Sequence, residues 1–170
     1  MYSQISFRKQ PGLAALLMVL SASLVLAQGN APLIQFKGVC DGRASGAVQA
    51  GILSTNSSVA GTASYIGRFT ITTKDTSDLA TNLSTGVVQL VAANGDMING
   101  LSVGRGGGPT DTPNLSRAVF LVTITGGTGR FQGITGVFTL DYLVDNSTIP
   151  AYISISGTLT GTIIIPVLAK

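Results

Sequence analysis

Apolar and polar residues alternate along most of this chain, most regularly near its C-terminus. In residues 151–165 the odd positions hold Ala, Ile, Leu or Gly, whereas the even positions hold mainly Ser and Thr. A period of two places successive side chains on opposite faces of a β-strand. The segment therefore predicts a long strand with one buried and one wet face.

Six other segments have strand-like patterns, and a further short segment is a candidate for an eighth strand. They are residues 44–54, 65–73, 86–93, 96–103, 118–125 and 134–143, with residues 33–37 as the eighth. In the last of the six, Phe138 and Tyr142 share an apolar face, and Asp141 is expected on the outside. Residues 118–125 are apolar almost throughout, which predicts a strand covered on both sides.

The connections between these segments predict hairpins. Asn94-Gly95 is a strong turn signal because both residues tolerate a positive φ. Gly-rich residues 125–129 and polar residues 145–148 separate the following pairs of segments. Residues 104–116 hold four Gly and two Pro and predict one long mobile loop.

Consecutive hairpins favour an all-β fold, an antiparallel closed barrel of about eight strands. Closure removes the exposed strand edges that a sheet would otherwise present, and few charges protect edges here. Gly136, Gly157 and Gly161 lie within strand patterns and fit bends at barrel corners. A β-sandwich is the alternative that the pattern leaves open.

The N-terminus predicts export. Arg8 and Lys9 precede an apolar run over residues 12–27, and Val25 and Ala27 suit the −3 and −1 positions of a cleavage site. The run is shorter than the roughly 20 residues of a membrane span, so a retained anchor is the weaker alternative. We expect a signal peptide at residues 1–27 and a single secreted or periplasmic domain at residues 28–170, without stable membrane insertion.

Composition removes several classes of function. Ten Lys and Arg face seven Asp, and without Arg8 and Lys9 the balance falls to +1 with scattered charges, so no nucleic-acid partner is expected. There is no His and no Glu, which excludes Ser-His-Asp and Cys-His catalysis. No metal and no cofactor are predicted. Asp75 and Asp78 are interpreted as solvated loop carboxylates.

The single Cys40 is expected to be buried rather than free for pairing between chains.

Three motifs in order resemble the allene oxide cyclase barrel-like domains of exported bacterial proteins. They lie at residues 65–70 (YIGRFT), 92–96 (AANGD) and 125–131 (TGGTGRF), and the resemblance covers about residues 42–165. It implies an eight-stranded barrel with an apolar interior, related in shape to dirigent proteins and lipocalins. Plant members cyclise a fatty-acid epoxide, and some bacterial relatives close polyketide rings. The plant cyclases use a polar constellation that includes a Glu, which this chain lacks, so no catalytic residue carries over.

These observations leave three hypotheses for function. The first is a binding or structural module for a small hydrophobic molecule, with Met97, Phe120, Phe138 and Tyr142 as candidate ligand-binding residues. Tyr142 is expected either as a core residue hydrogen-bonded to backbone or as a polar tip in an apolar cavity. The second is an allene oxide cyclase-like isomerase that shapes a flexible substrate. The third is a surface protein that self-associates through a strand edge. The oligomeric state stays open.

Overall fold

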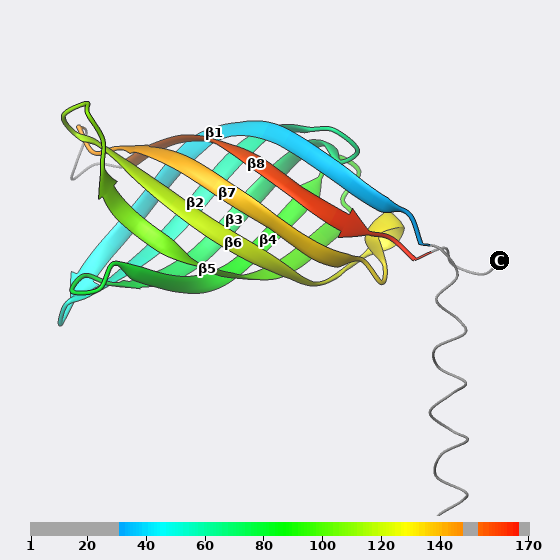
Figure 1. Ribbon diagram of the computed structural model, residues 1–170, viewed down its shortest axis with the longest axis horizontal. Helices are drawn as coiled ribbons and strands as arrows, with labels where there is room; N and C mark the ends of the chain where they lie inside the picture. The colour runs from blue at the N-terminus through cyan, green and yellow to red at the C-terminus, as the bar shows by residue number, and fades with distance from the viewer. Residues whose placement is uncertain (1–30, 148–152, 167–170) are drawn as a thin grey trace, which may run out of the picture. The chain divides into compact units, whose positions relative to one another are not determined.

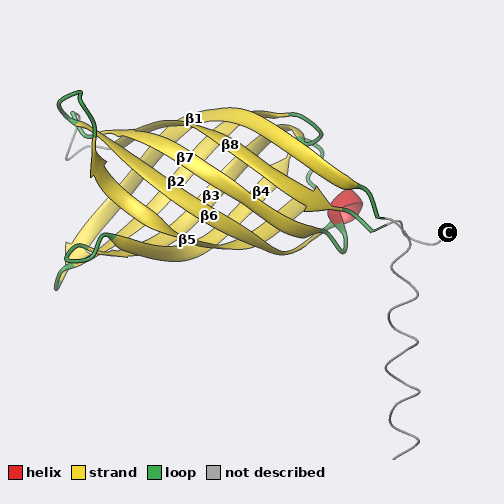
Figure 2. Ribbon diagram, viewed as in Figure 1, coloured by secondary structure: helices red, strands yellow, loops and turns green. Residues whose placement is uncertain are grey.

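The protein folds into a closed barrel of eight antiparallel strands, each paired with its neighbours in sequence order and the first with the last (Figures 1 and 2). The computed structural model describes residues 31–147 and 153–166. The strands are β1 (Leu33–Gln49), β2 (Ile52–Ala63), β3 (Gly67–Asp78), β4 (Leu83–Ala92), β5 (Met97–Pro109), β6 (Leu115–Gly127), β7 (Thr135–Asp145) and β8 (Ile153–Ile164). The predicted closed barrel is therefore confirmed, and the sandwich is excluded.

Closure leaves no strand edge free in the described part of the chain. β1 pairs with β2 on one side and with β8 on the other, and every other strand likewise has two partners. Self-association through a strand edge therefore has no edge to use. No helix in the described ranges is long and apolar enough to cross a bilayer. The predicted signal peptide lies outside the described residues.

The prediction of one strand over residues 44–54 was wrong. That segment contains the end of β1, a turn at Ala50 and Gly51, and the start of β2. Both turn residues have a positive φ, 49° and 80°, as a tight hairpin turn between twisted strands requires. The turn was missed because Ala-Gly is a weak signal. β2 was missed because its sequence is mostly Ser, Thr and Ala, with little apolar alternation.

The predicted mobile loop over residues 104–116 is also corrected. β5 continues to Pro109 and β6 begins at Leu115, so the connection is only residues 110–114. A side chain at Gly104 would collide with the Phe120 ring and the Val119 carbonyl, so close packing requires this glycine. The glycines of this segment therefore do not mark a loop. They allow close contact between strands and a bulge between Arg105 and Gly108.

The strand at residues 118–125 is covered on one side only. Ala118, Val122 and Ile124 face the interior, whereas Val119 and Leu121 are exposed on the outer surface. The expectation of cover on both faces was therefore wrong. Residues 134–143 behave as predicted, with Phe138, Leu140 and Tyr142 inside and Asp141 outside. In β8 the odd positions point inward, with Ile155, Leu159 and Ile163 buried.

One end of the barrel interior is filled with large apolar side chains. The 3-10 helix η1 (Gly129–Phe131), between β6 and β7, places the fully buried Phe131 at this end. Arg130 lies over the Phe131 ring, 4.6 Å from its centroid, and donates a hydrogen bond to the carbonyl of Ile66. We call this the closed end. It is the end that carries η1 in Figure 2.

Candidate ligand-binding pocket

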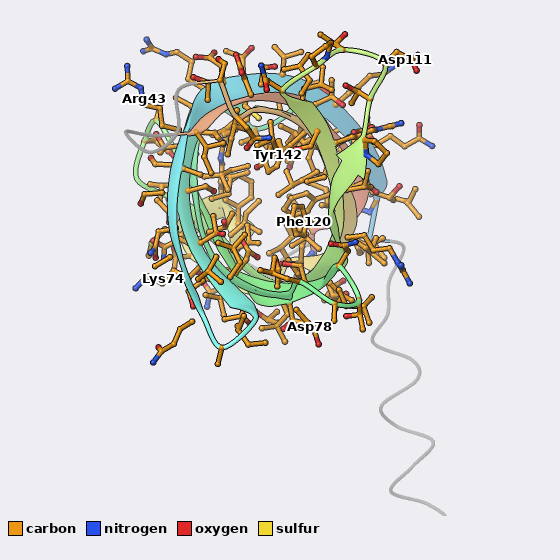
Figure 3. The ribbon with its side chains drawn as sticks, turned by 90° about the vertical axis from the view of Figure 1, so that its left-hand side faces the viewer. Arg43, Lys74, Asp78, Asp111, Phe120 and Tyr142 are labelled. Carbon is orange, nitrogen blue, oxygen red and sulfur yellow. The ribbon has the colours of Figure 1, made fainter. Side chains whose placement is uncertain are left out.

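A pocket of about 360 Å³ occupies the opposite end of the barrel interior. It lies where the β1–β2 and β3–β4 hairpins turn, since Leu53 and Ser77 beside those turns line it. Figure 3 looks into this end and shows Phe120 and Tyr142 inside the barrel, with Arg43 and Lys74 outside it. The volume is within the range of about 300–1,000 Å³ that small-molecule sites occupy.

The pocket has a polar wall that comes from β2, β3 and β4. The inward face of β3 changes character along the strand, from Phe69 and Ile71 at the closed end to Thr73, Asp75 and Ser77 at the pocket. These five residues occupy alternate positions and therefore point to the same face of β3. The change in residue type along that face converts an apolar core surface into a polar pocket surface. Ser57 of β2 and Ser84 of β4 extend this wall on either side of β3.

Hydrogen bonds connect the polar wall along β2 and β3 and tie it to Ser102 of β5, which lies behind it. The Thr73 hydroxyl donates to Asp75 Oδ2 over 2.5 Å, and the Ser102 hydroxyl of β5 donates to Asp75 Oδ1 over 2.8 Å. Ser57 Oγ lies 2.8 Å from Thr73 Oγ1. Because Thr73 has one hydroxyl hydrogen and gives it to Asp75, Ser57 must be the donor in that pair. The chain of donors thus runs from Ser57 through Thr73 to the carboxylate.

Gly86 explains how a β3 side chain reaches β5. Gly86 of β4 pairs with Asp75 on one side and with Ser102 on the other. A Cβ at this position would collide with the Asp75 carboxylate and with the Lys74 carbonyl. The missing side chain leaves the path along which Asp75 crosses β4 to meet Ser102.

The facing wall of the pocket is mainly apolar. It contains Phe120 of β6, Tyr142 and Val144 of β7, and Ile155 of β8. The Phe120 and Tyr142 rings are tilted by 58° with centroids 6.3 Å apart, a separation usual for aromatic pairs. A bound molecule would therefore meet aromatic and aliphatic surface on one side and oxygen atoms on the other.

The hydroxyl of Tyr142 has no hydrogen-bond partner among the described residues, although the side chain is only 3% exposed. The expectation of a core tyrosine bonded to backbone was therefore wrong. Burial, with smaller contributions from Cys40 and Asp75, raises the pKa of Tyr142, so the phenol stays protonated. Buried polar groups are nearly always satisfied, and this unsatisfied one belongs to a residue that lines a pocket.

Two other ionisable groups face the barrel interior. Burial raises the pKa of Asp75 above its ordinary 3.8, while the hydrogen bonds from Thr73 and Ser102 act against that rise by stabilising the carboxylate. Burial, together with the nearby Asp41 charge, raises the pKa of Cys40 to about 11. Cys40 is buried, as the sequence predicted, and its thiol is protonated at neutral pH.

The structure brings two of the four sequence-predicted binding residues together. Phe120 and Tyr142 line the pocket. Phe138 belongs to the closed end, where its ring meets that of Phe36 edge-on at 5.7 Å. Met97 begins β5 on its outer face, because its neighbour Ile98 points inward, and it does not line the pocket.

Asp75 is the residue that sequence reasoning missed. It was interpreted as a solvated loop carboxylate, but β3 extends through it to Asp78 and places it inside the barrel. Ile71 and Thr73 are inward positions two residues apart, and the same alternation predicts that position 75 also points inward. Asp141, in contrast, lies outside as expected and pairs with Arg117 at 2.5 Å.

Within the described ranges, no group of three or more His, Cys, Asp or Glu side chains is placed to hold a metal ion. A scan against protein-family models, a search of the curated proteins and a search of the solved structures each found no match. The resemblance to allene oxide cyclase barrel-like domains therefore stays a prediction from the sequence motifs.

Proposed function

We propose that this protein is an exported binding module that holds a small, largely apolar molecule in the pocket between the β3 wall and Phe120. The observation that carries the proposal is the buried hydroxyl of Tyr142, a pocket-lining residue, because this hydroxyl has no partner among the described residues. A bound molecule with one suitably placed polar atom would satisfy it and would also cover the apolar wall.

The two ends of the barrel support the same proposal. Large side chains fill the closed end, so the fold does not require a hollow interior. At the pocket end the inward positions carry small residues instead, including Ala44, Gly106 and Ala118. Small side chains at inward positions keep space that a purely structural barrel would fill with larger ones.

Native mass spectrometry of the mature protein, purified from its own host, tests this proposal. A small molecule released on unfolding is expected from the wild type. Gly106→Phe is the pocket-filling variant, since a Cβ at Gly106 meets no atom closer than 3.9 Å. This variant is expected to lose the bound mass.

Leu101→Phe is the matched control, because it adds a ring to the same strand on the exposed outer face. It is expected to keep the bound mass. If Gly106→Phe releases the same molecule in the same amount as the wild type, the binding site lies elsewhere and the proposal is contradicted. The proposal would also be contradicted if the wild type carries no molecule and binds no added compound that consists of a phenyl group on a short alkyl chain.

A second candidate is an isomerase or cyclase that works in the same pocket. It is favoured by the placement of Asp75 and Tyr142 on opposite walls, where a carboxyl group and a protonated phenol could assist proton transfer. Epoxy fatty acids and polyenes are the substrates to assay. Turnover that Asp75→Asn and Tyr142→Phe each abolish would support this activity, and turnover unchanged in both variants would oppose it.

A further inference from the structure

We propose that the molecule held in this pocket is a small organic cation, an ammonium group attached to an apolar body, with Asp75 as its counter-ion. This inference rests on the proposed binding function and names the chemical class of the ligand.

The first argument is the charge of the pocket. Of the described residues that line it, Asp75 is the one with an ionisable carboxylate, and none is Lys or Arg. The neighbouring Lys74 is exposed on the outer surface (Figure 3). A carboxylate in a partly apolar pocket without an opposite charge is costly, and a ligand that brings a positive charge removes that cost.

The second argument is an inventory of hydrogen-bond donors. The hydroxyl hydrogens of Thr73 and Ser102 are directed at Asp75, and that of Ser57 is directed at Thr73. Their remaining capacity is therefore to accept. The carboxylate has roughly four lone-pair sites and uses two of them here. Around Asp75 this wall is therefore an acceptor surface, which suits an ammonium group with three donors and no acceptor.

The third argument comes from the opposite wall. Phe120 and Tyr142 present aromatic surface on the far side of the pocket from Asp75. Aromatic faces attract cations and also cover alkyl or aryl groups. The Tyr142 oxygen adds an acceptor that no described protein group uses. On the polar wall itself, the buried Ser84 accepts from Ser77 over 2.9 Å, so its own hydroxyl hydrogen stays available as a donor.

Three probes that share one apolar body test the inference: 4-phenylbutylammonium, 4-phenylbutan-1-ol and 4-phenylbutyrate. Binding is measured by calorimetry or by NMR titration at neutral pH. We expect the ammonium to bind about tenfold or more tightly than the alcohol, because hydrogen bonds to charged groups are stronger than neutral ones. The carboxylate is expected to bind most weakly.

Asp75→Asn should remove the preference for the ammonium while leaving the alcohol nearly unaffected. Asp78→Asn is the matched control. It changes the net charge equally on the same strand, but Asp78 does not line the pocket, and its Oδ1 accepts from the backbone N–H groups of Ala80 and Thr81. Preference kept in Asp78→Asn and lost in Asp75→Asn supports the inference.

The pH dependence of the wild type gives a second measurement that does not depend on the Asn variant folding. Ammonium affinity should fall on acidification as Asp75 takes up a proton, whereas alcohol affinity should not. β2 and β4 carry no ionisable side chains, and Arg105 of β5 is exposed on the outer surface. Cys40 of β1 and Tyr142 of β7, the other ionisable groups of the interior, stay protonated because burial raises the pKa of both.

The outcomes separate the two proposals. Equal binding of all three probes, or an ammonium affinity that is flat with pH, overturns the cation inference and leaves a neutral-ligand pocket standing. Binding of none of the three overturns the inference together with the proposed binding function.

Discussion

The closed end and the pocket end of the barrel interior are built by the same strands but from different residues. β3 gives the buried Ile71 to the closed end and Asp75 to the pocket, and β7 gives Phe138 to the former and Tyr142 to the latter. Period two decides only whether a side chain points inward. What the inward face does changes along the strand, so a single barrel can hold a core for stability and a site for binding.

The largest effect should come from removing a ring at the closed end. Phe138 is 2% exposed and packs edge-on against Phe36. Phe138→Ala is expected to lower the free energy of unfolding by about 3–5 kcal/mol, since it loses buried surface and leaves a cavity. Phe120→Ala, at the partly exposed pocket end, should cost about 1 kcal/mol. Urea denaturation of both variants measures the difference.

This comparison fails if the two variants lose similar stability. Equal losses would mean that the pocket end contributes packing as fully as the closed end. Probe binding should show the reverse order, because Phe120 lines the pocket and Phe138 does not. A Phe138→Ala protein that stays folded should therefore bind 4-phenylbutan-1-ol almost as the wild type does.

An intermediate effect is expected at the glycine beneath Asp75. Gly86→Ala introduces a methyl group where the Asp75 carboxylate and the Lys74 carbonyl already lie. Forcing atoms into an occupied site costs about 1–3 kcal/mol. The displaced carboxylate should also lose its hydrogen bond from Ser102, so probe affinity and stability should fall together.

Gly106→Ala is the control for this substitution, because a methyl group there meets only the Ala118 side chain at 3.9 Å. Its free energy of unfolding should change little. If Gly106→Ala destabilises the protein as much as Gly86→Ala, the loss comes from glycine replacement in strands generally and not from the crowded row of Asp75, Gly86 and Ser102.

The sequence predicted the barrel more completely than it predicted the site. Residues 151–165 and 134–143 combine strict alternation with large apolar residues, and in their described parts, 153–165 and 134–143, the apolar face that the pattern defines is the inward one. β2 was missed because its inward positions, such as Thr55 and Ser57, are polar and do not stand out from the outward ones. Those same polar positions form part of the pocket wall.

The site was only half predictable for a related physical reason. Apolar inward residues such as Phe120 and Tyr142 follow from hydrophobic alternation. Asp75 does not, because a carboxylate in a Ser- and Thr-rich segment is usually solvated. Its inward position depends on where β3 ends, and its reach to Ser102 depends on the strand order and on Gly86. These are properties of the closed sheet, which one segment of sequence does not contain.

The smallest effect should appear in the pH dependence of stability, where an inward and an outward carboxylate behave oppositely. Burial raises the folded pKa of Asp75 above 3.8, so the folded state holds this proton more tightly than the unfolded state. Asp75 therefore favours folding below pH 3.8 and loses that contribution as pH rises through the folded pKa. The Arg117 hydrogen bond lowers the pKa of Asp141, so Asp141 contributes stability above 3.8 and loses it as pH falls through the folded pKa.

Urea denaturation of the ligand-free protein between pH 3 and pH 7 measures both carboxylates against their Asn variants. The Asp75→Asn variant should gain stability relative to the wild type as pH rises, whereas the Asp141→Asn variant should lose it. The Asp141 effect should also shrink in high salt, because its ion pair with Arg117 is solvent-exposed and screened. If both Asn variants lose stability relative to the wild type as pH rises, the hydrogen bonds from Thr73 and Ser102 stabilise the Asp75 anion more than burial destabilises it. The pocket would then hold a carboxylate that is already compensated, and the inference of a cationic ligand would rest on the donor inventory and the aromatic wall alone.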